Sequence, residues 1–138
     1  MNWILLSLIA MFFNFVVFIL IRKLTKRMSS SVMSLYLFGI SAIYLIITNL
    51  ILEESYSMPK IAFLLLTTAG LAGSIVYLVL YKAISIAPNI GYPVAVFSLH
   101  IVITTIISAL FLGTSLTLIK FIGVIIAAAG IISLILWK

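Results

Sequence analysis

Five apolar stretches, each close to 20 residues long, follow one another along this chain of 138 residues. A helix needs about 20 apolar residues to cross the hydrocarbon of a bilayer. Only 7% of the residues are charged, against about 25% in soluble domains. The sequence therefore predicts an all-α membrane protein, a bundle of five transmembrane helices in a single transmembrane domain over residues 1–138. The spans are predicted at about 2–21, 33–52, 60–81, 89–112 and 118–137.

Turn and cap signals separate the stretches. Ser29, Ser30 and Ser31 offer N-cap groups for the second helix, and Pro59 stands where the first turn of the third helix tolerates proline. The connection at 85–93 contains two prolines and a glycine, which predicts a turn before the fourth helix.

Lysine and arginine are unequally divided between the two sides of the predicted bundle. Two of them, Lys60 and Lys120, fall on one side, and six fall on the other: Arg22, Lys23, Lys26, Arg27, Lys82 and Lys138. The positive-inside rule then predicts an N-terminus outside and a cytoplasmic C-terminus in a plasma (inner) membrane. Since the bases lie at the ends of apolar runs, topology explains the net charge of +6. The expected partner is the lipid bilayer, and no nucleic acid is expected.

A polar stripe runs along the fourth stretch. Pro93, His100, Thr104 and Ser108 share one helical face, at steps of seven, four and four residues. Ionisable residues inside a membrane usually mark substrate or ion pathways, and His100 is the only one expected at depth. The stripe predicts a substrate pathway with His100 and Thr104 as candidates; the alternative is a neutral imidazole that serves helix packing.

Other stretches carry further candidates. The third has small and polar residues at helical spacing, and Ser74 and Tyr77 are substrate-pathway candidates there, with helix packing as the alternative. Asn14 in the first stretch is a costly amide to bury, and pathway lining and helix packing both remain open for it. The candidates for helix packing are Gly70, Gly123, Ala127 and Gly130.

The sequence lacks the parts of an enzyme or a metal site. It holds one histidine, no cysteine and two acidic residues, Glu53 and Glu54, which are adjacent. These residues form neither a catalytic dyad nor a set of metal ligands. We expect no enzymatic activity, no cofactor and no metal.

Residues 60–138 carry an ordered series of motifs. The fourth span is entered through Ala83, a short loop and Pro93-Val94, and a Leu-Gly-x-x-Leu-Thr turn at 112–117 follows it. The last span carries Gly123, Ala127 and Gly130. In this order the motifs resemble an EamA-type repeat of the drug/metabolite transporter superfamily. The chain departs from that family at Thr114, where a glutamate is usual. The small multidrug resistance branch is similar in size, but it typically has four spans and an acid in the first, where this chain has Asn14.

The resemblance implies one five-helix half of a secondary transporter. Full-length members of the superfamily resemble two such repeats in opposite orientations, with the substrate between them. A homo- or hetero-dimer with a second five-helix repeat is thus expected, and the charge bias disfavours an antiparallel pair of identical chains. The expected substrate is a small neutral, zwitterionic or amphipathic molecule. Alternatives are a flippase subunit for a lipid-linked sugar and a non-transporting membrane subunit.

Overall fold

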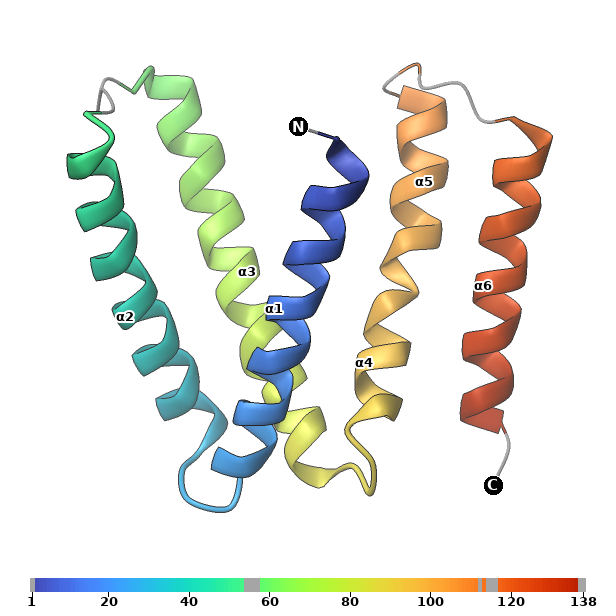
Figure 1. Cartoon of the computed structure of the whole chain (residues 1–138), viewed down its shortest axis with the longest axis horizontal. Helices are drawn as coiled ribbons and strands as arrows, with labels where there is room; N and C mark the ends of the chain where they lie inside the picture. The colour runs from blue at the N-terminus through green and yellow to red at the C-terminus, as the bar shows by residue number, and fades with distance from the viewer. Residues whose placement is uncertain (1, 54–57, 112, 114–116, 137–138) are drawn as a thin grey trace. The chain divides into compact units, whose positions relative to one another are not determined.

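Helices form all of the regular secondary structure in the described part of the chain. The structure is a computed structural model, and it describes residues 2–53, 58–111, 113 and 117–136. Its elements are α1 (Trp3–Leu24), α2 (Ser30–Ile51), α3 (Lys60–Ile86), α4 (Gly91–Ser98), α5 (His100–Phe111) and α6 (Leu118–Leu136) (Figure 1). The predicted all-α fold class is confirmed.

Four helical segments are long and apolar enough to cross a membrane, judged by length and composition. They are α1 and α2 with 22 residues each, α3 with 27, and the α4–α5 segment Gly91–Phe111 with 21. A rise of 1.5 Å per residue makes α3 about 40 Å long. The last helix, α6, holds a shorter apolar stretch, Leu118–Leu134. This set fits a five-helix membrane bundle in which α4 and α5 together form one crossing.

Local signals place the helix starts. Asn2 caps α1 with its side-chain oxygen, and Ser29 Oγ accepts the backbone N–H of Val32 at 3.4 Å to cap α2. Ser29 opens the serine run that predicts a cap here. α3 begins at Lys60, directly after Pro59; a proline before the first turn loses no helical hydrogen bond, because the first N–H groups have no partner there.

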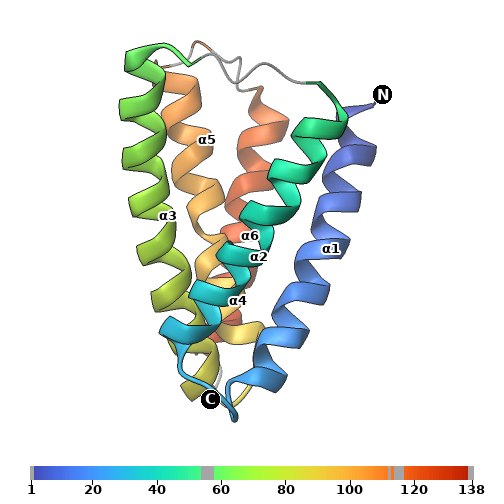
Figure 2. The same cartoon turned by 90° about the vertical axis from the view of Figure 1, so that its left-hand side faces the viewer.

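The chain divides into two compact units, Met1–Ile86 and Ala87–Lys138. In the first unit, α1, α2 and α3 come together at the end that carries the α1–α2 connection (Figure 2). All its buried residues lie near that end: Phe18, Ile21, Met33, Ser34, Leu80, Tyr81 and Ile84. Arg22 Nη1 also donates a hydrogen bond to the Ile84 carbonyl there, which joins α1 to α3. The well-packed part of this unit is therefore its basic end.

In the second unit, α6 packs alongside both α4 and α5. Gly113, just beyond α5, has a φ of 65°, in the left-handed region that glycine adopts without a Cβ clash. None of the described residues of this unit is buried. Large apolar side chains therefore face outward, as they do in proteins whose solvent is lipid.

The bounds of α1 and α2 differ from the expected spans by one to three residues, and two later stretches differ more. α3 continues to Ile86, past Lys82, because nothing between 81 and 86 interrupts a helix before the turn around Pro88. The stretch expected as one helix at 89–112 begins at Gly91 and is divided at Leu99 into α4 and α5. The division places His100 at the first position of α5.

Candidate functional site

One face of α5 forms a shallow polar depression of about 290 Å³. Its lining residues are His100, Ile101, Thr104, Thr105 and Ser108. His100, Thr104 and Ser108 follow one another at four-residue steps, which places them above one another on a single helical face. Three members of the predicted stripe, His100, Thr104 and Ser108, therefore line the same depression. The fourth, Pro93, belongs to the first turn of α4 and is not among the lining residues.

The helix is interrupted directly before this face. The backbone N–H of Leu99 donates to the Val96 carbonyl at 3.1 Å, and the N–H of Val102 donates to the Leu99 carbonyl at 3.1 Å. These bonds span three residues instead of four, so the chain makes a tight 3₁₀-type turn between α4 and α5. Ser98 Oγ also donates to the Val94 carbonyl at 2.9 Å, and such back-bonding often bends helices. Since Pro93 lies well before Leu99, proline does not cause the interruption.

The imidazole of His100 occupies this interruption. Its Nδ1 lies 2.7 Å from the Phe97 carbonyl oxygen. A carbonyl oxygen only accepts hydrogen bonds, so Nδ1 carries the hydrogen and Nε2 of the neutral ring is an acceptor. The ring also lies 4.8 Å from the Phe97 ring, between centroids. The backbone thus fixes the tautomer, and the exposed side chain leaves Nε2 accessible to a ligand.

Hydroxyl oxygens supply the rest of the polar lining. Thr104 Oγ1 donates to the His100 carbonyl and Thr105 Oγ1 donates to the Ile101 carbonyl, each at 2.8 Å. Their hydrogens are occupied, and their lone pairs remain available to accept. Ser108 adds a hydroxyl that can donate or accept. With a neutral ring, this face mainly offers acceptors and suits a ligand with hydrogen-bond donors and no fixed negative charge.

The family comparison agrees with an all-helical membrane chain. The model of the EamA-like transporter family matches residues 1–136. The chain belongs to that family. The match includes the first two helices, which the sequence motifs at 60–138 did not cover, and it confirms the resemblance to EamA-type drug/metabolite transporters. No curated protein and no solved structure gives a significant match to the chain.

Membership of the EamA-like family makes this a multi-pass membrane protein of a transporter type. The family is one of transporters and not of enzymes. Thr114, where the sequence departs from the usual EamA pattern, lies outside the described residues, as do Leu112 and Leu116 of the same turn.

The other pathway candidates of this EamA-like chain belong to the first unit. Tyr77 contacts the Phe38 ring of α2 at 5.5 Å and the Tyr81 ring at 5.7 Å, between centroids. Ser74 Oγ donates to the Gly70 carbonyl of its own helix at 2.9 Å. Asn14 is exposed on α1. None of these three lines the depression on α5, and their role in a pathway stays a prediction.

The packing candidates lie on open helix surfaces. A Cβ added at Gly70, Gly123 or Gly130 would meet no described heavy atom within 4 Å, and Ala127 is exposed. These residues therefore mediate no close helix contact in the described part of the chain. Their role as packing surfaces stays a prediction, and it would require contact with something else.

Sequence reasoning did not single out Thr105 and Ile101, which complete the depression. Strict four-residue spacing from His100 passes over both, although the Thr104-Thr105 pair is a visible signal. The hydrogen bond from His100 to the Phe97 carbonyl was also not expected, because it depends on the interruption at Leu99. A pattern of residue types does not encode that local geometry.

Proposed function

We propose that this EamA-like chain is one five-helix subunit of a secondary transporter for a small neutral, zwitterionic or amphipathic metabolite, and that the α5 depression lines the substrate pathway. The observation that carries the proposal is the family match over residues 1–136. The polar lining supports it, because polar side chains on a membrane helix are costly unless they face a path or a partner. His100 is the only titratable residue of that lining, so the described lining holds no permanently charged residue.

A second five-helix repeat completes the site in this proposal. The depression is shallow and belongs to one helix face, so a substrate bound there would stay exposed on its other side. Repeats of this kind pair around a site near the midplane. The partner is a second copy or a different chain. The excess of lysine and arginine on one predicted side favours a partner of opposite topology over an antiparallel copy.

His100 couples the site to pH in this proposal. When the ring gains a proton, Nε2 changes from an acceptor to a donor. A substrate that donates to Nε2 then loses its acceptor and meets a positive charge. Protonation of His100 is therefore expected to weaken substrate binding.

Transport by the purified protein tests the proposal. A ligand-stabilisation screen would identify a solute, and its uptake would be measured in proteoliposomes at several pH values. We expect uptake by the wild type, reconstituted alone or with a five-helix partner of opposite topology, and a loss of about tenfold in His100→Ala, equal to one hydrogen bond of about 1.4 kcal/mol. His100→Gln should bind without pH dependence. Ser133→Ala is the control, because Ser133 bonds to its own helix on α6.

Three results would contradict parts of this scheme. Unchanged uptake and pH dependence in both His100 variants would reduce the residue to packing. Movement of a lipid-linked sugar between leaflets, with no uptake of soluble solutes, would favour the flippase alternative. Absence of uptake both by the protein alone and together with a five-helix partner of opposite topology would favour the non-transporting membrane subunit.

A further inference from the structure

A second polar depression lies at the basic end of the first unit, and it shares no lining residue with the α5 depression. Its volume is about 270 Å³, and its polar lining consists of Thr25, Ser29, Ser30, Lys82 and Ser85. These residues come from the α1–α2 connection, the start of α2 and the last turns of α3. Three separate parts of the chain therefore contribute to one small polar surface.

The hydrogen-bond groups of this depression favour an anion. Thr25 and Ser85 use their hydroxyl hydrogens on backbone carbonyls. Ser29 Oγ accepts from the backbone, so its O–H can still donate. Ser30 adds a second hydroxyl, and the Lys82 ammonium brings three N–H donors. The first N–H groups of α2 add a weak positive potential.

A buried hydroxyl group without a hydrogen-bond partner lies on the side of α2 that carries Ser30. Ser34 lies one turn below Ser30, on the same side of the helix. It is only 7% exposed, and its Oγ has no hydrogen-bond partner among the described residues. A buried hydroxyl normally has a partner in the protein or in a bound molecule. Ser34 lines neither the depression nor the apolar groove on α1 and α2, so its hydroxyl is an unpaired polar group beneath this surface.

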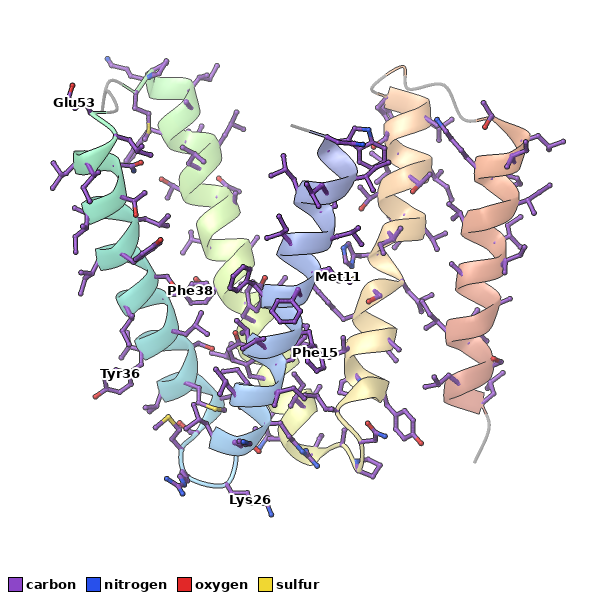
Figure 3. The ribbon with its side chains drawn as sticks, in the orientation of Figure 1. Met11, Phe15, Lys26, Tyr36, Phe38 and Glu53 are labelled. Carbon is purple, nitrogen blue, oxygen red and sulfur yellow. The ribbon has the colours of Figure 1, made fainter. Side chains whose placement is uncertain are left out.

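No acidic side chain among the described residues neutralises the basic end. The two acids in the sequence are Glu53 and Glu54. Glu53 follows the far end of α2, whose 22 residues span about 33 Å. Figure 3 shows Glu53 and Lys26 at opposite ends of the first unit. Lys23, Lys26 and Arg27 are exposed beside the depression and raise its positive potential.

An apolar groove adjoins this polar surface. It has a volume of about 400 Å³ and lies along α1 and α2, where Leu20, Leu24, Met33, Leu37 and Ile40 line it. Met28 lines both the groove and the depression. Leu20 and Leu24 also line a basic depression that includes Lys23, Lys26 and Arg27. The surface therefore changes continuously from apolar to cationic.

We propose that this surface binds an anionic glycerophospholipid. The phosphate lies against Lys82, Ser29 and Ser30, and one acyl chain lies in the α1–α2 groove. A soluble anion would use the depression but not the groove, and a neutral lipid would use the groove but not the charges. The predicted orientation places the basic end at the cytoplasmic leaflet, where anionic headgroups are common. The site is separate from the α5 depression, so it does not depend on the transport proposal.

Lipid binding to the purified protein tests this proposal. Delipidated full-length protein in a neutral detergent would be titrated with dioleoyl phosphatidylglycerol or dioleoyl phosphatidylcholine, and bound lipid would be counted by native mass spectrometry. We expect phosphatidylglycerol to bind about tenfold more tightly, because a charge-assisted hydrogen bond adds to the shared acyl contacts. Lys82→Gln should remove most of that preference, and Lys82→Arg should keep it.

Lys60→Gln is the matched control, because Lys60 lies at the opposite end of the same helix. Its preference for phosphatidylglycerol should equal that of the wild type. Glycerol 3-phosphate and dihexanoyl phosphatidylglycerol, which lack long chains, should compete at least tenfold less well than the dioleoyl lipid. Circular dichroism would confirm that each variant is folded.

Each of three outcomes would overturn the proposal. Equal binding of the two dioleoyl lipids would show that the charges are not used. Equal competition by glycerol 3-phosphate would mark a site for soluble anions instead of a lipid. An equal loss in Lys60→Gln and Lys82→Gln would mark a general charge effect with no defined site.

Discussion

Glu53 has an unusual backbone conformation. It follows the last helical turn of α2 with a φ of 54°, in the left-handed region. For a residue with a Cβ, this backbone conformation raises the free energy by about 1 kcal/mol or more. The increase is small for glycine, and for asparagine it is smaller than for most residues. Glycine is the usual residue at this position after a helix. The conformation at Glu53 therefore destabilises the folded protein, and a substitution that suits this conformation can remove the strain.

We predict that Glu53→Gly stabilises the protein by about 1 kcal/mol. Glu53→Asn should give a smaller gain. Glu53→Gln, which removes the charge without relieving the backbone, should give none. Thermal unfolding in detergent measures all three. A gain in Glu53→Gln equal to that in Glu53→Gly would mean that charge, and not backbone geometry, controls the effect.

For Arg22, the sequence predicts the side of the membrane but not the hydrogen bond that the side chain makes. Its charge and its place at the end of an apolar run predict the side of the membrane. Its hydrogen bond to the Ile84 carbonyl is not predictable, because it joins residues 62 positions apart and one partner is a backbone group that any residue has. The same limit holds for the depression around Lys82. Both depend on how α1 and α3 pack.

Loss of the Arg22 hydrogen bond should destabilise the first unit. The Ile84 carbonyl belongs to a residue that is fully buried, so Arg22→Ala leaves a carbonyl without its donor at a cost of roughly 1–3 kcal/mol. Arg27→Ala is the control, because Arg27 is exposed. Urea or thermal unfolding in detergent compares them. Equal stability of the two variants would mean that the hydrogen bond contributes nothing.

At the scale of elements, most of the helical segments could be predicted and the interruption at Leu99 could not. Apolar run length, the serines at 29–31 and Pro59 place the starts of α2 and α3 within a few residues. Leu99 is neither proline nor glycine, so no residue type marks the break. The turn before α4 is better encoded: Asn89 Oδ1 accepts the backbone N–H of Gly91 at 2.8 Å.

Asn89 therefore has a testable role in starting α4. Asn89→Ala removes the side-chain acceptor and should cost about 1 kcal/mol, whereas Asn89→Asp keeps an acceptor and should cost little. Unfolding midpoints of the two variants in detergent would be compared with the wild type. If Asn89→Asp were as destabilised as Asn89→Ala, the side-chain acceptor would not be what starts this helix.

At the scale of the whole molecule, the buried residues mark the basic end as the anchored part of the first unit. The sequence could predict an all-helical membrane protein, because run length and composition determine that class. It could not predict that the core gathers at one end, since apolar side chains occur all along each helix. Which face meets lipid and which meets a partner is not encoded by hydrophobicity alone.

The unequal distribution of basic residues predicts a single orientation of the whole molecule in the membrane. Six basic residues on one predicted side and two on the other should give a single orientation, with the C-terminus in the cytoplasm. A C-terminal reporter that is active only in the cytoplasm, paired with one active only outside, measures this in cells. Comparable signals from both reporters would mean dual insertion, and the objection to an antiparallel pair of identical chains would then disappear.

The length of α3 has a mechanical consequence. A helix of 27 residues is about 10 Å longer than a typical hydrocarbon core of about 30 Å. It would need a tilt of about 40°, the upper limit for membrane helices, to fit inside. At smaller tilts the helix protrudes from the acyl chains at the Lys60 end, at the turn from Lys82 to Ile86, or at both. Bilayer thickness therefore sets the depth of the Lys82 ammonium, so the same protein would hold this charge at different heights in thin and thick membranes.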